Sequence, residues 1–149
     1  EIVARNPGIW RVIFSKDLLK EITFEALRMA EDQIFISKTI IRARKVFFFD
    51  NLIYTYFTGS DYHLTKNSAA LQDLLPAFNQ TSKMISVGNL EVHPFLQLMA
   101  VRQLISGLKF GTFRTRIGLI KSVIRSGLLV RPKFLITFYK SIFSSKWSF

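Results

Sequence analysis

The sequence predicts an α/β fold, in the form of a helix-rich α+β fragment whose short mixed strands precede a helical tail. Two runs rich in aromatic and β-branched residues, at 10–14 and 45–57, are typical of strands. From Ser68 onward, apolar residues recur at helical spacing. The chain has 149 residues, the size of one domain, and is long enough to bury a core.

The first predicted elements are a strand and two helices. Residues 10–14 form the strand, and Ser15 is placed to cap one or two helical turns after it. A longer helix, with an apolar stripe, covers about residues 30–43. Its first turn contains Glu31 and Asp32, the only adjacent acidic pair in the chain.

The middle of the chain predicts a change of architecture near residue 67. The run 45–57 is interrupted by a turn-prone pair, so we expect two short strands or one bent strand. Residues 58–67 are polar and form an exposed loop. The helices predicted after it cover 68–84, 93–106, 112–126 and 133–144. We therefore expect two units, an N-terminal portion of residues 1–67 and a helical, basic extension of residues 68–149.

Absent or rare residue types exclude several kinds of site. The chain has no cysteine, which excludes disulfides and thiolate metal ligands and fits a reducing compartment. His63 and His93 are the only histidines, so we expect no zinc site. No stretch without a charged residue exceeds ten residues, and a membrane-spanning helix needs ~20. The first residues do not resemble a signal peptide, and we expect the chain to be part of a longer protein.

The positive charge is concentrated in the tail. Residues 1–100 contain eleven basic and ten acidic side chains, whereas residues 101–149 contain ten basic and no acidic ones. The predicted helix at 112–126 places Phe113, Ile117, Ile120 and Ile124 on one stripe and Arg114, Lys121 and Arg125 on the next. Such cationic amphipathic helices are typical of membrane surfaces.

We therefore expect residues 112–147 to contact an anionic membrane surface. Ordinary helical packing with a solvated basic face is the alternative. Nucleic acid is a less favoured partner, because the apolar component is heavier than phosphate binding requires.

Three stretches, "GIWRVIFSKDLLKEITF", "LRMAEDQIFISK" and "NLIYTYFTGSDYHLT", follow one another within residues 7–66. In this order and spacing they resemble the acceptor side of a family 2 inverting glycosyltransferase with the GT-A fold. The residues that match the family pattern are Trp10, Phe14, Lys16, Leu18, Leu19, Glu31, Asp32, Phe35, Tyr54, Tyr56, Leu64 and Thr65.

The resemblance implies a catalytic role for the acidic pair. Asp32 would be the general base that takes a proton from an acceptor hydroxyl as its oxygen attacks the anomeric carbon of a nucleotide-sugar. Glu31 would orient the acceptor or a neighbouring loop. The structural alternative is that both carboxylates only stabilise the helix start through its macrodipole.

The other residues of the pattern have weaker implications. Trp10 is either a wall of the acceptor site or a buried core residue. Lys16 either lies close to phosphates or is only a solvent-exposed residue of a short helix. Tyr54 and Tyr56 point to one face of their strand, where core packing is the default. In the polar loop that ends near Thr65, His63 is a candidate contact of the diphosphate or its metal.

The chain also departs from the family. It has no D-x-D motif for a divalent cation, so the Mg²⁺ or Mn²⁺ expected in the full-length enzyme would find its ligands mainly in a missing N-terminal half. We expect this chain alone to be inactive. The implied function is transfer of a sugar, with inversion, to a glycan or lipid-linked acceptor in cell-surface polysaccharide synthesis, on the cytoplasmic face of the membrane. The alternative is a non-enzymatic basic helical module that binds anionic membrane or nucleic acid.

Overall fold

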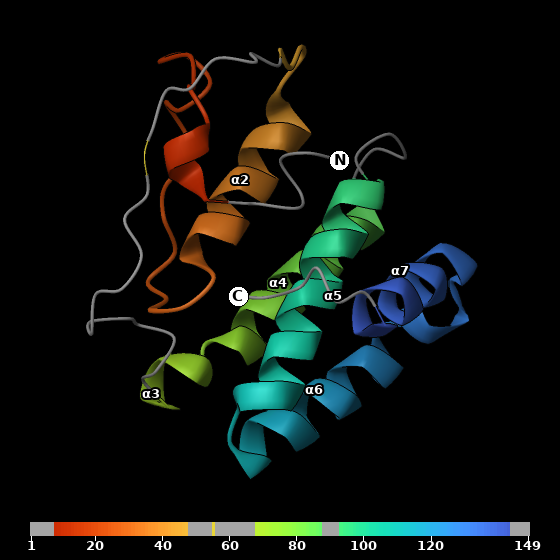
Figure 1. Cartoon of the computed structure of the whole chain (residues 1–149). Coiled ribbons are helices and arrows are strands. Elements are labelled where there is room, and N and C mark those ends of the chain that lie inside the picture. Colours follow the sequence, from red (N-terminus) through yellow and green to blue (C-terminus); the bar gives the residue numbers. More distant parts are fainter. Residues whose placement is uncertain (1–7, 48–54, 56–67, 88–92, 144–149) are drawn as a thin grey trace.

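The computed structural model describes residues 8–47, 55, 68–87 and 93–143 (Figure 1). Within these ranges the chain is mostly helical, and no residue lies in a strand. The elements are η1 (Ile9–Arg11), α2 (Glu31–Arg42), α3 (Ser68–Leu71), α4 (Leu74–Val87), α5 (His93–Phe110), α6 (Phe113–Arg125), η3 (Leu128–Val130) and α7 (Pro132–Phe143).

The described part of the chain is therefore all-α, and the predicted α/β class with short mixed strands is wrong. The expected strand at 10–14 is a 3₁₀ turn, η1, followed by unpaired backbone. Its aromatic and branched residues suit a strand, but a strand also needs a neighbour for its backbone hydrogen bonds. Residues 45–47 likewise lie in no strand and are exposed. Most of the run 45–57 and the predicted loop at 58–67 lie outside the described residues.

The helical predictions are largely confirmed. The helix expected at 30–43 is α2, and the helices expected at 93–106, 112–126 and 133–144 are α5, α6 and α7. The helix expected at 68–84 is divided into α3 and α4 by a turn at Gln72 and Asp73. Ser15 accepts a hydrogen bond from the backbone N–H of Leu18 at 3.3 Å, as a cap of a short turn does.

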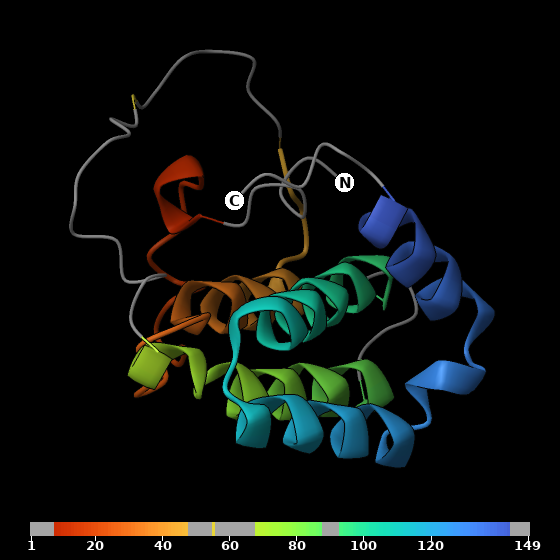
Figure 2. The ribbon, with the colours of Figure 1, turned by 60° about the horizontal axis from the view of Figure 1, so that its bottom comes forward.

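Helices α4 and α5 run alongside each other at the centre of the described structure (Figures 1 and 2). Both α2 and α6 pack against this pair, and α7 packs against α5. In Figure 1, α2 lies to the left of the pair and α7 to its right. No helix in the described ranges has the length and apolar character that crossing a bilayer requires.

The core consists of two apolar clusters. The larger cluster joins α4, α5, α6 and α7 through Phe78, Ile85, Leu96, Ala100, Val101, Leu104, Leu119, Val123, Leu128 and Phe134. The smaller one joins the start of α2 to α3 and α4 through Ala30, Ile34, Leu71, Leu74 and Ala77. The second cluster crosses the boundary expected near residue 67, and the division into two units stays a prediction.

Helix α6 has one buried face and one apolar face that is exposed. Leu119 is fully buried and packs so closely on α5 that a Cβ added at Gly107 would lie 2.1 Å from its Cδ1 atom. The next residue, Ile120, is 47% exposed. Because successive helical residues point about 100° apart, the burial of Leu119 and the exposure of Ile120 together show which face of α6 points toward the core.

We predict that Leu119→Ala lowers the free energy of unfolding by about 2–5 kcal/mol, because it opens a cavity in the core. The same truncation next to it, Ile120→Ala, should change the free energy by no more than about 0.5 kcal/mol, as is usual at the surface. Urea unfolding of both variants measures the difference. The reverse order of stability would mean that α6 is turned the other way.

Candidate functional site

The segment before α2 runs back along that helix, antiparallel to it. Two ion pairs establish the direction: Arg42 with Glu21 at 3.0 Å, and, one turn nearer the helix start, Lys38 with Glu25. Nearer the start of α2 than both ion pairs, the ring of Phe35 stacks on that of Phe24, with 4.1 Å between the ring centroids. These contacts bring the segment to the N-terminal end of α2.

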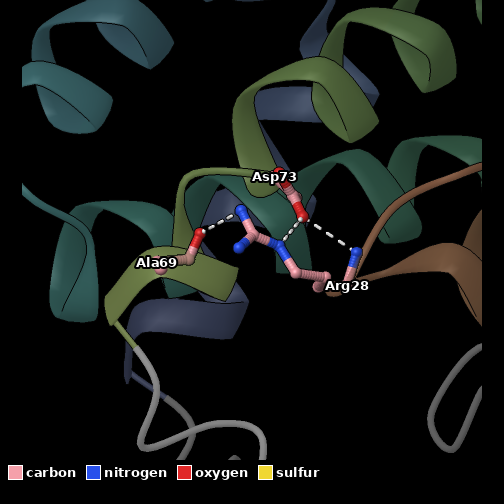
Figure 3. A network of polar contacts seen from close by, with 3 residues as sticks. All are labelled: Arg28, Ala69 and Asp73. Carbon is pink, nitrogen blue, oxygen red and sulfur yellow. Dashed lines mark hydrogen bonds and ion pairs between the residues drawn. The ribbon is translucent and has the colours of Figure 1, made fainter.

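Arg28 fastens the end of this segment to the junction of α3 and α4 (Figure 3). Its backbone N–H and its Nε donate to Asp73 Oδ2 at 2.8 and 3.2 Å, and its Nη2 donates to the carbonyl oxygen of Ala69 at 2.9 Å. These hydrogen bonds lower the pKa of Asp73, which therefore stays ionised at neutral pH. The chain is thus held three residues before α2 begins.

Ala30, the residue that opens α2, has a strained backbone. Its φ of 66° and ψ of 15° lie in the left-handed region, which costs a residue with a Cβ roughly 1–2 kcal/mol. Its methyl group is only 4% exposed and packs in the smaller core cluster. Non-glycine residues in this region are frequent at functional sites, where the surrounding structure holds them in place. The left-handed turn determines the direction in which the first residues of α2 leave the segment.

Asp32, in the first turn of α2, has a half-buried carboxyl group. Burial, and then the negative charge of Glu31, raise the pKa of Asp32 from 3.8 to about 6. Three influences act in the other direction: the backbone N–H of Gln33 donates to Oδ1 at 2.7 Å, the backbone N–H of Asp32 itself also favours the charged form, and the Arg102 guanidinium contributes a positive charge. Burial outweighs them, although the helix dipole also favours the ionised form.

The positive charge that lowers the pKa of Asp32 belongs to Arg102 on α5. Arg102 is itself largely buried, which lowers its pKa, while the charge of Asp32 acts to raise it. Beside Asp32, the buried side-chain Oε1 of Gln33 accepts no hydrogen bond from the described residues. A buried acceptor without a donor costs about 1–3 kcal/mol, which a bound hydroxyl group would relieve. The start of α2 therefore combines a carboxylate, an amide oxygen and a cation.

This arrangement is chemically suited to proton transfer. A carboxylate that only caps a helix is stabilised in its charged form, and its pKa falls. The Asp32 carboxyl instead titrates close to neutral pH, where a general base or acid is most effective. The N-cap position itself is occupied by Ala30, which has no side-chain cap.

The structure brings together only some of the residues predicted to form the site. Glu31 and Asp32 share the first turn of α2, as predicted. Trp10 lies in η1, which contacts α2; its indole covers Gly8 and is 41% exposed. Lys16 is exposed on the turn after Ser15. The remaining predicted residues, Tyr54, Tyr56, His63 and Thr65, lie outside the described residues.

Sequence reasoning missed Arg28, Gln33 and Arg102. Arg28 lies inside the stretch 27–38 but matches no position of the family pattern, and Arg102 lies outside all three stretches; each meets its partner across a long stretch of sequence. Gln33 stands inside the recognised acidic stretch, but only its burial without a donor distinguishes it from an ordinary helix residue.

Other possible sites in the described residues are limited. No group of three acidic or histidine side chains among them could hold a metal ion. A shallow hollow of about 170 Å³ lies between α4 and α6, lined by Gln72, Leu75, Thr112, Arg114 and Thr115. None of the predicted site residues lines it.

Comparisons of the chain with protein-family models, with characterised proteins and with solved structures found no match. A role for Asp32 therefore rests on the local geometry and on the sequence pattern around it.

We predict that Asp32→Asn makes the folded chain more stable at about pH 8. The folded chain holds this proton up to about pH 6 and the unfolded chain releases it near 3.8, so the wild-type free energy of unfolding falls as pH rises through this window. The neutral amide escapes a penalty of at most about 3 kcal/mol.

Urea unfolding at about pH 4 and about pH 8 measures this effect. The gain in stability of Asp32→Asn should be small at the lower pH, because the wild-type carboxyl is then protonated in the folded state and, with its ordinary pKa of 3.8, about half protonated in the unfolded state. Equal destabilisation at both pH values would contradict the raised pKa and indicate a carboxylate that only stabilises the helix.

Proposed function

We propose that the chain supplies the acceptor side of an inverting glycosyltransferase, with Asp32 as the general base. The observation that carries this proposal is the half-buried Asp32 carboxyl, with its pKa of about 6, in the helical turn that follows the left-handed residue Ala30. The sequence pattern around the acidic pair names the reaction, and the geometry supports the assignment of the base.

The reaction needs one carboxylate on the acceptor side. The acceptor hydroxyl gives its proton to Asp32 while its oxygen forms a bond to the anomeric carbon of the donor sugar. The bond from that carbon to the nucleoside diphosphate breaks on the opposite side, and the diphosphate leaves with the electron pair. A single in-line displacement of this kind inverts the configuration at the anomeric carbon.

The neighbours of Asp32 have distinct roles in this proposal. The Gln33 Oε1 atom, which is buried and finds no donor among the described residues, accepts a hydrogen bond from a second hydroxyl of the acceptor and orients it. The charge of Glu31 raises the pKa of Asp32 and so strengthens the base. The Arg102 charge acts the other way and keeps the carboxylate ionised at neutral pH.

The donor side lies beyond the described residues. In enzymes of this class a divalent cation such as Mg²⁺ or Mn²⁺ neutralises the leaving diphosphate. The residues described here do not fit such a cation, because they offer no cluster of metal ligands. The chain also has no D-x-D motif. Residues beyond these 149, or another chain, would then bind the nucleotide and its metal.

We predict that Asp32→Asn, in the complete gene product, lowers sugar transfer by about 10²–10⁴-fold, the usual contribution of a general base. Release of nucleoside diphosphate from a panel of nucleotide-sugars, in the presence of a lipid and glycan extract, measures the rate. In the wild type the rate should rise with pH up to about 6, where Asp32 loses its proton, and then level off.

The matched control is Asp17→Asn, which removes an exposed carboxylate whose ion-pair partner among the described residues is Lys20. It should transfer sugar at the wild-type rate. Transfer by Asp32→Asn within tenfold of the wild type would show that another group is the base. Transfer by neither the wild type nor the control would favour the non-enzymatic module.

A further inference from the structure

The last three helical elements expose an unusual amount of apolar side chain. On α6 the outward stripe is Phe113, Ile117, Ile120 and Ile124, with exposed fractions of 79%, 36%, 47% and 61%. The residues that α6 buries are Thr115, Leu119 and Val123. At about 100° per residue, the exposed stripe is centred roughly 130° around the helix from the buried one. The helix is thus apolar on the side that no described residue covers.

Helix α7 repeats the arrangement. Its exposed apolar residues are Leu135, Ile136, Tyr139 and Ile142, whereas Phe134 and Ser141 face the core. Between the two helices, in η3, Val130 is 82% exposed. Two helices and the turn that joins them therefore present apolar side chains outward. Scattered exposed apolar residues are normal, but a helical stripe of them indicates an interaction surface.

Cationic side chains accompany both apolar stripes. Arg114, Lys121 and Arg125 form one line on α6, about a quarter turn from its exposed stripe. Lys133 and Lys140 form a second line on α7, roughly a third of a turn from its exposed apolar residues. All five are exposed, and no carboxylate occurs in residues 101–149 to neutralise them. None of the five side chains pairs with another described residue.

Another cation of α6 has a structural task instead. The guanidinium of Arg116 donates to the carbonyl oxygens of Gly111 and Lys109 at the end of α5, at 2.9 and 3.2 Å. This contact distinguishes Arg116 from the other three cations of α6, which pair with no residue in the described ranges. A substitution of Arg116 would disturb the junction of α5 and α6, so it is unsuitable as a test of the surface.

We propose that the exposed face of α6 docks in the headgroup layer of an anionic lipid bilayer. A bilayer surface binds both the apolar stripe and the cations, since the stripe enters the boundary of the acyl chains and the cations contact lipid phosphates. A second copy of the chain docked on this face would place its cations beside those of the first copy, and the like charges would repel each other. Nucleic acid would pair with the cations but leave the isoleucine stripe in water. The charge and the apolar stripe together thus select the lipid surface.

Binding to vesicles tests this proposal directly. The 149-residue chain should float with vesicles of equal parts phosphatidylcholine and phosphatidylglycerol, bind weakly to phosphatidylcholine alone, and dissociate in high salt. Replacing Arg114, Lys121 and Arg125 by Gln should weaken binding by about 100-fold, at about fivefold per cation. Ile120→Gln with Ile124→Gln should weaken it by at least about tenfold.

The matched control carries Lys83→Gln and Val87→Gln, an exposed cation and an exposed apolar residue of α4. It should bind vesicles as the wild type does. Asp32→Asn should also bind normally, so failure of the docking proposal is distinguishable from failure of the transferase proposal. Circular dichroism and urea midpoints check that every variant is folded.

The absence of cysteine permits a second measurement that locates the face. A single cysteine at Ile124, labelled with an environment-sensitive fluorophore, should shift its emission to the blue when anionic vesicles are added. The same label at Asn79, on the exposed side of α4, should not shift.

Four results would overturn the proposal. The first is equal vesicle binding by the wild type and the α6 variants, and the second is equal shifts at the two labelled positions. The third is tighter binding to a DNA or RNA duplex than to anionic vesicles. The fourth is a concentration-dependent dimer, formed without lipid, that Ile120→Gln with Ile124→Gln abolishes.

Discussion

The packing of the first turn of α2 against the α4 and α5 pair is the constraint on which the proposed site depends. It buries Ala30 and Ile34 in the smaller core cluster and, with them, half-buries the carboxyl group of Asp32. The Arg28 hydrogen bonds to Asp73 and Ala69 keep the incoming segment in place, so the left-handed turn at Ala30 cannot relax without breaking them. A carboxyl group held in this way is withheld from water, and its pKa rises.

A buried acidic group of this kind lowers the stability of the chain at neutral pH. Folding would gain from a neutral residue at position 32, and from a residue without a Cβ at position 30 if the lost packing were small. Local features that oppose folding are expected where function requires them. Two such features within three residues, both held by the same packing, favour a chemical role for Asp32 over helix capping alone.

The helices were predictable from the sequence because their signals are local. Helical spacing of apolar residues located α2, α5, α6 and α7 closely. The fold class was not predictable, because the run at 10–14 has strand-like residues but no pairing partner among the described residues, and pairing is decided by distant parts of the chain. The break between α3 and α4 was also missed, since Arg28, more than forty residues earlier in the sequence, binds at that turn.

For the site and the docking surface, too, some features could be predicted from the sequence and others could not. The acidic pair could be found from sequence, and so could the two stripes of α6. The sequence could not show which side of α6 faces the core. Leu119 and Val123 are fewer than the four apolar residues of the outward stripe, and only their packing in the core cluster with α5 shows that they are the buried ones. The Arg102 charge on α5 and the unpaired Gln33 oxygen likewise exist as site features only in the folded chain.

The most direct measurement of the central claim is the titration of the Asp32 carboxyl carbon by ¹³C NMR in the folded chain, with Asp32→Asn used to assign the resonance. A midpoint of about 6 is expected, because the group is withdrawn from water beside Glu31. A midpoint at or below the ordinary value of 3.8 would mean that the carboxylate is solvated or stabilised by the helix start, and would contradict its role as a base.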